Sequence, residues 1–162
     1  SGNLSVERHD ELYILDFPSR PAAVIDPVPE IAESLGIEPQ AYLRARDHMG
    51  LLENAEQVYN LSPNFEVMKR VSDMIGLIVT AKGDDCDFVS RYFSPHDSMK
   101  EDPVTGSAHC TLIPFWKNRL NKNKMAARQL SARSGVLQCE YLGDRVKIAG
   151  NAVLYLEGEI TP

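Results

Sequence analysis

The sequence predicts an α+β fold. Both ends of the chain read as series of strands, the helical segments are few, and one long helix is expected between the two strand-rich parts. Helices and strands do not alternate regularly, as they would in a doubly wound parallel sheet. The length of 162 residues suits one domain, and the sequence shows no linker, low-complexity segment or internal repeat.

The first half opens with an expected hairpin. Leu4–Arg8 and Glu11–Phe17 place apolar residues among β-formers, and His9-Asp10 supplies a turn between them. A short helix is expected over Glu30–Leu35, because Gly36 stands where helices commonly end. The remaining expectations are a strand over Val58–Leu61, a helix over Asn64–Val71, and either helix or extended chain over Glu38–Arg46.

The second half places strands on both sides of one long helix. Pro103–Lys117 is the expected helix, since proline is favoured at the first helical position. Two strands precede it, Gly76–Ala81 and Phe88–Phe93, with Ser94–Glu101 as a polar loop. Turn signals divide the rest into four expected strands, Gln129–Ala132, Gly135–Tyr141, Val146–Ile148 and Ala152–Ile160.

Composition excludes several classes of function. The net charge of -6 argues against a nucleic-acid binder, which needs a basic face. No apolar run has the length of a membrane span, and the first residues lack a signal-peptide core, so we expect no membrane partner. Cys86, Cys110 and Cys139 form no CxxC pair, and the histidines have no metal-ligand spacing. We therefore expect no metal and a cytoplasmic setting.

The strongest candidate site is the loop-to-helix junction that begins at Asp102. If the helix starts at Pro103, the backbone N–H groups of Thr105, Gly106 and Ser107 have no intrahelical partners. Gly106 has no Cβ, so a ligand can approach its backbone closely. Together with the positive end of the helix dipole, these groups predict a site that binds a carboxylate next to Asp102.

A purely structural interpretation competes with this one. Aspartate is a preferred N-cap, and a cap from Asp102 to the Thr105 N–H would withdraw that donor from a ligand. Local chemistry alone favours this structural interpretation and leaves an anion site beside a carboxylate as the alternative. His109 and Cys110 follow inside the helix, where we expect them to be buried packing residues.

A longer motif contains this junction. The string Ser90-Arg91-Tyr92-Phe93-Ser94-Pro95 is followed, after a short gap, by Glu101-Asp102-Pro103-Val104-Thr105-Gly106-Ser107-Ala108-His109. The pair resembles the second-domain signature of the PhzF-like (phenazine-biosynthesis) isomerases. Ser1–Val6 and Leu15–Pro18 are similar to the entry into that domain, and Gly150–Gly158 is similar to its closing strand.

The resemblance implies a diaminopimelate-epimerase-like fold, in which a β-barrel-like sheet surrounds a central helix. Two such domains enclose the active site in that family, so residues 1–162 are expected to form a single C-terminal domain whose complementary N-terminal domain lies outside this chain. The family's better-characterised member isomerises a dihydro-hydroxyanthranilate by moving a proton, with neither a metal nor an organic cofactor. A small carboxylated substrate is the partner that this implies.

Carried over by residue, the resemblance gives roles to the junction. The N–H groups of Gly106 and Ser107, with Thr105 beside them, would hold the substrate carboxylate. Asp102 would bond a polar substituent or assist proton transfer. The family's principal acid/base, a glutamate helped by a histidine, belongs to the first domain and matches no residue here. We therefore expect the isolated chain to be inactive.

Two interpretations stay open. The first is half of a cofactor-independent isomerase or epimerase, completed by a domain that supplies a glutamate facing Asp102. The second is a non-catalytic binding or interaction module that keeps the fold. A thiol racemase is disfavoured, because it needs paired cysteines where this chain has Asp102. A domain without its mate would expose the covered surface, so a homodimer is also an expected partner state.

Overall fold

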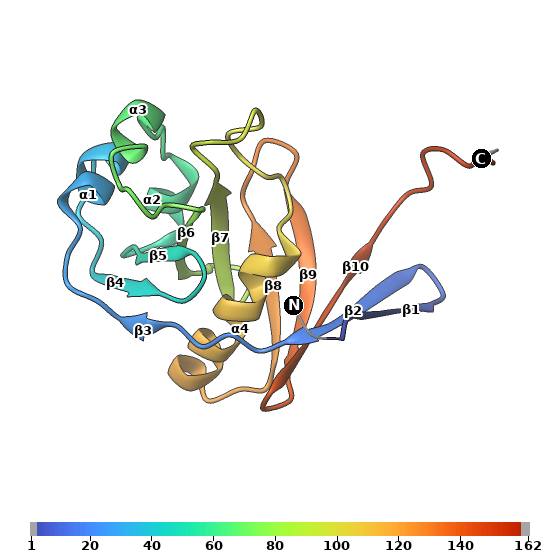
Figure 1. The fold of residues 1–162 in the computed structure, drawn as a ribbon. Helices are drawn as coiled ribbons and strands as arrows, with labels where there is room; N and C mark the ends of the chain where they lie inside the picture. Colours follow the sequence, from blue (N-terminus) through green and yellow to red (C-terminus); the bar gives the residue numbers. More distant parts are fainter. Residues whose placement is uncertain (1–2, 160–162) are drawn as a thin grey trace.

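The computed structural model describes residues 3–159, which form one mixed sheet with a few helices (Figure 1), as the α+β class predicts. The sheet has ten strands in the order β1-β2-β10-β9-β8-β7-β6-β5-β4-β3. In chain order the elements are β1 (Ser5–His9), β2 (Leu12–Pro18), β3 (Ala23–Val24), α1 (Pro29–Leu35), β4 (Ala41–Arg44), β5 (His48–Leu51), α2 (Ala55–Tyr59), α3 (Phe65–Met68), β6 (Leu77–Lys82), β7 (Phe88–Phe93), α4 (Gly106–Leu120), β8 (Lys124–Gln129), β9 (Gly135–Tyr141) and β10 (Arg145–Asn151).

Most neighbouring strands are antiparallel, and two pairs, β5–β6 and β7–β8, are parallel. A parallel pair needs a crossover connection. The first crossover contains α2 and α3, and the second contains α4. The loop before α4 therefore starts at the end of β7, and α4 returns the chain to β8.

Two apolar cores lie on the two faces of β4–β7. On one face, every strand from β4 to β10 packs against α4, including Ile78 and Phe88, and the helix contributes Leu112, Ile113 and Trp116. The other face carries α1, α2 and α3. Strand β6 is consequently buried on both sides, and its two faces alternate between the cores. Trp116 is fixed there, because its Nε1 donates to Thr80 Oγ1 at 2.9 Å.

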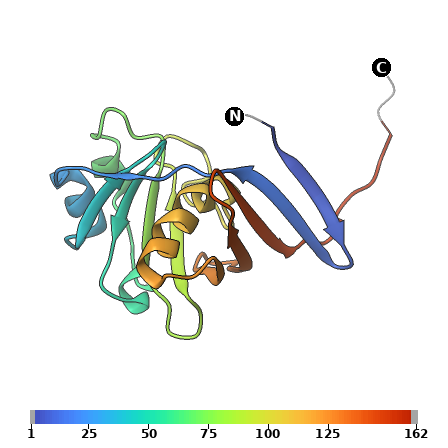
Figure 2. The ribbon, with the colours of Figure 1, turned by 90° about the horizontal axis from the view of Figure 1, so that it is seen from below.

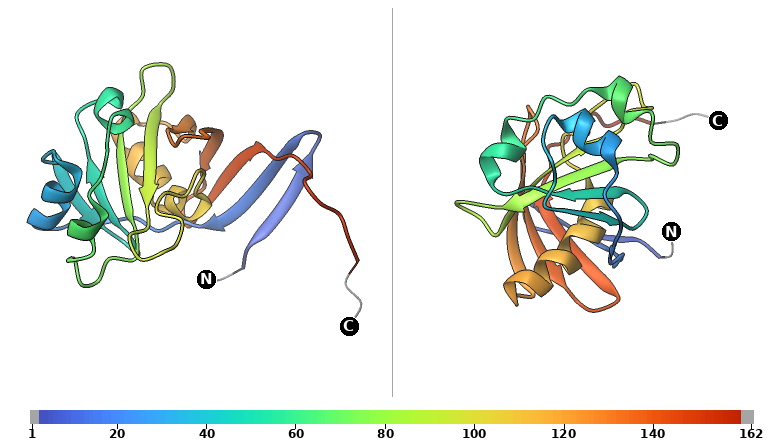
Figure 3. Two further views of the ribbon diagram at one scale, coloured as in Figure 1. Left: turned by 90° about the horizontal axis from the view of Figure 1, so that it is seen from above. Right: turned by 90° about the vertical axis from the view of Figure 1, so that its left-hand side faces the viewer.

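The sheet curves around α4 without closing (Figure 3), and β1 and β3 are its two edges. The expected β-barrel-like closure is thus absent from the part of the chain that the structure describes. The hairpin β1–β2, together with β10, extends away from the body of the molecule (Figure 2). Residues 152–159 follow β10 as an extended segment, here called the terminal segment.

Several expected boundaries agree with the structure. Strands β7 and β9 have the expected bounds, Gly36 ends α1 with a left-handed φ of 68°, and Asp10 turns the first hairpin with a φ of 53°. The stretch Glu38–Arg46, expected as either helix or extended chain, contains the strand β4. The expected helix over Asn64–Val71 is shorter, because α3 spans Phe65–Met68 after an Asn64 cap.

Other expectations were wrong for identifiable reasons. The strand expected over Val58–Leu61 overlaps a helix, α2, because the Asn54 side chain accepts a bond from the Gln57 N–H and caps it. The strand expected over Gln129–Ala132 lies earlier in the chain, as β8 (Lys124–Gln129), because that segment pairs with β9. No strand occupies 152–159, and Ile160 lies outside the described residues, as do Ser1 and Gly2 of the entry motif.

The central helix begins three residues later than expected, at Gly106 instead of Pro103. Thr105 takes the N-cap position with an extended backbone, φ −109° and ψ 101°. Asp102–Val104 then belong to a turn in front of the helix. This displacement decides which groups of the junction are free to meet a ligand.

Candidate functional site

A cleft of about 500 Å³ opens beside the turn in front of α4. We call it the Asp102 cleft. Its lining comes from the β4–β5 connection, the segment before β6, the end of β7, the loop after β7 and the start of α4. It consists of Arg46, Ile75, Tyr92, Ser94, Asp97, Ser98, Met99, Asp102, Thr105 and Ser107. The structure thus brings three predicted site residues, Asp102, Thr105 and Ser107, to one cavity. Gly106 lines a neighbouring hollow of about 930 Å³, bounded mainly by β2, β9 and β10.

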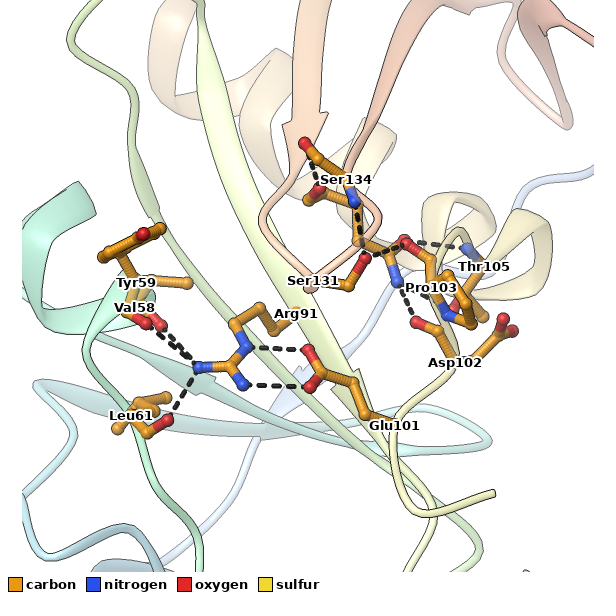
Figure 4. A network of polar contacts seen from close by, with 11 residues as sticks. Val58, Tyr59, Leu61, Arg91, Glu101, Asp102, Pro103, Thr105, Ser131 and Ser134 are labelled. Atoms are coloured by element: carbon orange, nitrogen blue, oxygen red, sulfur yellow. Dashed lines mark hydrogen bonds and ion pairs between the residues drawn. The ribbon is translucent and has the colours of Figure 1, made fainter.

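The turn in front of α4 is held by one buried glutamine at the end of β8. Gln129 is 1% exposed, and its Oε1 accepts a bond from the Thr105 N–H at 2.7 Å. Its Nε2 donates to the Asp102 carbonyl oxygen at 2.6 Å and to Thr105 Oγ1 at 3.0 Å. Ser131 Oγ adds a bond to the Pro103 carbonyl oxygen at 2.8 Å (Figure 4). The turn is therefore fixed by side chains from another strand.

The three Gln129 bonds, here called the Gln129 clamp, bear on the interpretation of Asp102 as a helix cap. Its side chain does not cap the helix, since α4 has no side-chain cap, and the Thr105 N–H is taken by Gln129. Within residues 3–159, no group donates a hydrogen bond to the Asp102 carboxylate, and Figure 4 shows it outside the bonded network. The Thr105 N–H is accordingly not a free donor, contrary to the expectation, whereas the Asp102 carboxylate is free.

Gly106 and Ser107 begin the helix, so their N–H groups have no intrahelical acceptors. A Cβ built on Gly106 would meet only Phe17 Cε2 at 3.6 Å, an ordinary contact. The fold itself therefore does not require glycine there, and the open space above its backbone remains accessible. The first turn of α4 can bind an anion through these N–H groups and the Ser107 hydroxyl.

The loop that carries Asp102 is also anchored at its start. Arg91 on β7 binds Glu101 in a bidentate ion pair, with Nε–Oε1 at 2.7 Å and Nη2–Oε2 at 2.9 Å. The Arg91 Nη1 donates to three carbonyl oxygens that follow or end α2, those of Val58, Tyr59 and Leu61 (Figure 4). The residue before Asp102 is thereby tied to β7 and α2.

Arg46 and Asp47 form a second part of the site that the sequence did not predict. They lie in the tight connection from β4 to β5, and their side chains form a bidentate pair, with Nη2–Oδ2 at 2.8 Å and Nε–Oδ1 at 3.2 Å. The Tyr92 hydroxyl donates to Asp47 Oδ1 at 3.1 Å, and Arg46 Nη2 donates to Ser107 Oγ at 3.2 Å. One guanidinium therefore bridges a buried carboxylate and the first turn of α4.

Burial and charge shift the titration of this group. Burial lowers the pKa of Arg46, but the bonds and charge of Asp47 outweigh it and raise that pKa above its ordinary value. Burial and the Asp47 charge also raise the pKa of Tyr92. Arg46 therefore stays cationic and Tyr92 stays a neutral hydroxyl at physiological pH.

His109 and Cys110 are buried packing residues, as expected. The His109 ring is fully buried, and its Nδ1 donates to the Thr105 carbonyl oxygen at 2.8 Å. Burial lowers the pKa of His109 to about 4, so the ring is neutral. Burial raises the pKa of the Cys110 thiol, whose Sγ lies 3.9 Å from the Gly106 carbonyl oxygen. Neither side chain lines the Asp102 cleft.

No helix within residues 3–159 is both long and apolar enough to cross a membrane. No group of three or more His, Cys, Asp or Glu side chains within residues 3–159 is arranged to hold a metal ion. The three cysteines are free thiols.

A family model described as "Phenazine biosynthesis-like protein" matches residues 31–158. The chain belongs to the phenazine biosynthesis-like protein family. The match includes the whole motif from Ser90 to His109 and all residues of the Asp102 cleft.

Relatives of this family are similar over nearly all of the chain. An "Uncharacterized isomerase" of Pseudomonas aeruginosa is 47% identical over 161 residues, which are 99% of this chain and 61% of the relative. A crystal structure of a phenazine biosynthesis PhzC/PhzF protein from Clostridium difficile has a TM-score of 0.89 and 44% identity, and covers 98% of this chain and 61% of that one. A PhzF-family structure from Enterococcus faecalis has a TM-score of 0.91 and 42% identity, with the same coverage.

A more distant structure supports the fold alone. A "Predicted Epimerase" from Pseudomonas aeruginosa has a TM-score of 0.68 at 13% identity, so the chain shares the architecture found in epimerase-like proteins. The chain spans about three fifths of the length of the phenazine biosynthesis-like relatives that it matches. The activity of those longer proteins therefore enters below as a proposal.

Proposed function

We propose that this phenazine biosynthesis-like protein is an isomerase or epimerase that moves a proton on a small carboxylated substrate. Asp102 takes part in the proton transfer, and the first turn of α4 binds the substrate carboxylate through the N–H groups of Gly106 and Ser107, with the side chain of Thr105 lining the cleft beside them. In this proposal the reaction uses neither a metal nor an organic cofactor. The proposed setting is the cytoplasm.

The observation that carries the proposal is the free Asp102 carboxylate. It lines the same cleft as Ser107, while a dedicated glutamine holds its backbone. An aspartate with a purely structural role would bond nearby backbone N–H groups, and the Asp102 carboxylate accepts no such bond within residues 3–159. A partnerless carboxylate in a cleft can accept a proton or bond a polar substituent of a substrate. The relative named as an isomerase, 47% identical, supports the same class of reaction.

Proton transfer that isomerises a substrate needs both a donor and an acceptor. Asp102 supplies one of them, and we propose that a complementary domain, corresponding to an N-terminal first domain, supplies the other. In this proposal residues 1–162 act as the C-terminal half. The described part of the chain leaves a surface for such a mate: the projecting hairpin β1–β2, strand β10 and the terminal segment.

The test measures deuterium incorporation from heavy water. The chain is combined with the part of the Pseudomonas aeruginosa relative that it does not match, and the mixture is incubated with amino acids, hydroxy acids and unsaturated cyclic carboxylic acids. Mass spectrometry then identifies the acid that gains deuterium. Asp102→Asn removes the proton acceptor and should slow this exchange by about 100-fold or more.

Asp26→Asn is the matched control, because Asp26 also precedes a proline ahead of a helix but is exposed and lies outside the cleft. It should exchange at the rate of the unchanged protein. Equal exchange rates for Asp102→Asn and Asp26→Asn, with both proteins folded, would remove Asp102 from the chemistry. Binding of the complementary polypeptide without any exchange would favour the non-catalytic interaction module.

A further inference from the structure

The side chain of Arg46 is held at the Asp102 cleft by a buried support. Asp47 is 2% exposed and bonds the guanidinium through both of its oxygens. Tyr92, also buried, donates its hydroxyl to Asp47 and so fixes the carboxylate in turn. A guanidinium braced in this way loses little further freedom when it binds a ligand.

Part of the guanidinium remains available. Nε and Nη2 of Arg46 both donate to the Asp47 carboxylate. Nη2 also donates to Ser107 Oγ and, at 3.4 Å, to the Tyr92 hydroxyl. The two N–H groups of Nη1 bond no acceptor within residues 3–159. Because the Arg46 side chain is 39% exposed and lines the cleft, these donors can meet a bound molecule.

Charge indicates what that molecule carries. The described residues that line the cleft include two carboxylates, Asp97 and Asp102, and one cation, Arg46. An acidic substrate entering beside Asp102 meets like charge and needs a compensating partner. Arg46 supplies it at the first turn of α4, where its Nη2 lies 3.2 Å from Ser107 Oγ.

We propose that Arg46 is a substrate-binding residue, which holds the substrate carboxylate jointly with Ser107 and the first turn of α4. This rests on the proposed function and adds a specificity element to it: the substrate is an anion at the cleft, and its neutral amide is rejected. Asp47 and Tyr92 act through Arg46 and are positioning residues.

The experiment uses benzoate as the probe and benzamide as its neutral counterpart, each titrated into the labelled chain by NMR. The readouts are the amide signals of Gly106 and Ser107 and the dissociation constant. Benzoate should shift both signals, and benzamide should bind more weakly. Arg46→Gln should weaken benzoate binding by about tenfold, as loss of a charge-assisted bond implies, and leave benzamide unchanged.

Two further variants separate binding from folding. Arg46→Gln leaves Asp47 buried without its cation, so the double variant Arg46→Gln with Asp47→Asn removes that unpaired charge and should bind benzoate as weakly as the single variant. Arg70→Gln is the matched control, since Arg70 pairs with exposed Glu33 outside the cleft. It should bind benzoate like the unchanged chain.

The outcomes distinguish the two proposals. If benzoate shifts Gly106 and Ser107 equally in the unchanged chain and in the folded double variant, the role of Arg46 is wrong and the carboxylate site at α4 stands. If benzoate moves neither signal in the unchanged chain, the carboxylate site fails, and the proposed function fails with it.

Discussion

At the scale of single residues, hydrogen-bond partners decide which groups can do chemistry. Asp102 lines the cleft, and Asp47 pairs with the Arg46 of that cleft. Asp47 is buried and bonded to Arg46 and Tyr92, whereas Asp102 has no donor within the described residues. Asp47 therefore holds Arg46 in place, and the Asp102 carboxylate is left without a partner, as the proposed role in proton transfer requires. The same distinction separates His109, whose ring is buried, from an acid/base residue.

The buried His109 ring predicts a pH dependence of stability. Its pKa is about 4 in the folded protein and near 6.5 when unfolded, so the unfolded state takes up the proton first as pH falls. The stability that the neutral His109 ring contributes to the fold is fully present above pH 6.5 and is lost as the pH falls from 6.5 to 4. Urea unfolding at pH 7.5 and 4.5 should show a loss of roughly 2–3 kcal/mol that His109→Gln lacks. Equal losses in the two proteins would show that the ring is protonated in the fold.

The motif from Glu101 to His109 allowed Asp102 and Ser107 to be predicted, because their neighbours in sequence are also their neighbours in the site. Arg46, Asp47 and Gln129 could not be predicted in this way. They reach the cleft from segments distant in the sequence, and a single chain contains no signal that pairs them with the junction. Tyr92 belongs to the Ser90–Pro95 part of the motif, but its hydroxyl donates to Asp47, which the motif does not contain.

At the scale of elements, the end of β8 determines where α4 begins. Gln129 is the last residue of β8. Its side-chain amide accepts a bond from the Thr105 N–H and donates one to the Asp102 carbonyl oxygen. The proline at position 103 favours a helix start there, but three bonds from Gln129 hold the turn in another geometry. A tertiary contact thus overrides a local preference.

Replacement of this amide should destabilise the turn. Gln129→Ala removes three hydrogen bonds, two of them fully buried, and should lower the free energy of unfolding by roughly 2–4 kcal/mol. It should also speed hydrogen exchange at the Thr105 amide. Gln138→Ala, on an exposed position of β9, should change the free energy of unfolding by less than about 0.5 kcal/mol. Similar effects of both substitutions on stability would contradict the Gln129 clamp.

Elements with strong local signals were predictable, and those that depend on partners were not. Strands β7 and β9 combine β-forming residues with clear turns at their ends. Strand β8 begins with Lys124 and contains Arg128, so its sequence reads as a charged surface, and pairing with β7 and β9 makes it a strand. The ten-strand order likewise depends on crossovers that periodicity does not reveal.

At the scale of the whole molecule, the middle of the described chain is covered by packing and both of its ends are exposed. Strands β4–β7 are packed on both faces, while β1 is exposed along its whole length. The terminal segment is apolar and almost fully exposed, with Val153 at 93% and Tyr155 at 98%. Contiguous exposed apolar side chains of this kind indicate an interaction surface.

This surface predicts association. The chain should bind the part of its Pseudomonas aeruginosa relative that it does not match, or form a homodimer when alone. Leu154→Glu with Leu156→Glu should weaken that association by about tenfold or more in sedimentation velocity. Tyr59→Glu, which changes an exposed apolar side chain on α2, should leave it unaltered. Association unaffected by the double substitution would place the interface elsewhere.

The most direct test of the central claim is solvent-deuterium incorporation into the panel of small carboxylic acids. It is measured with the chain alone, with the complementary polypeptide alone, and with the two together. If the two polypeptides share one active site, one carboxylic acid gains deuterium when both are present and none does with either alone. Label with the chain alone would contradict a shared site, and no label in any of the three would contradict proton transfer as its function.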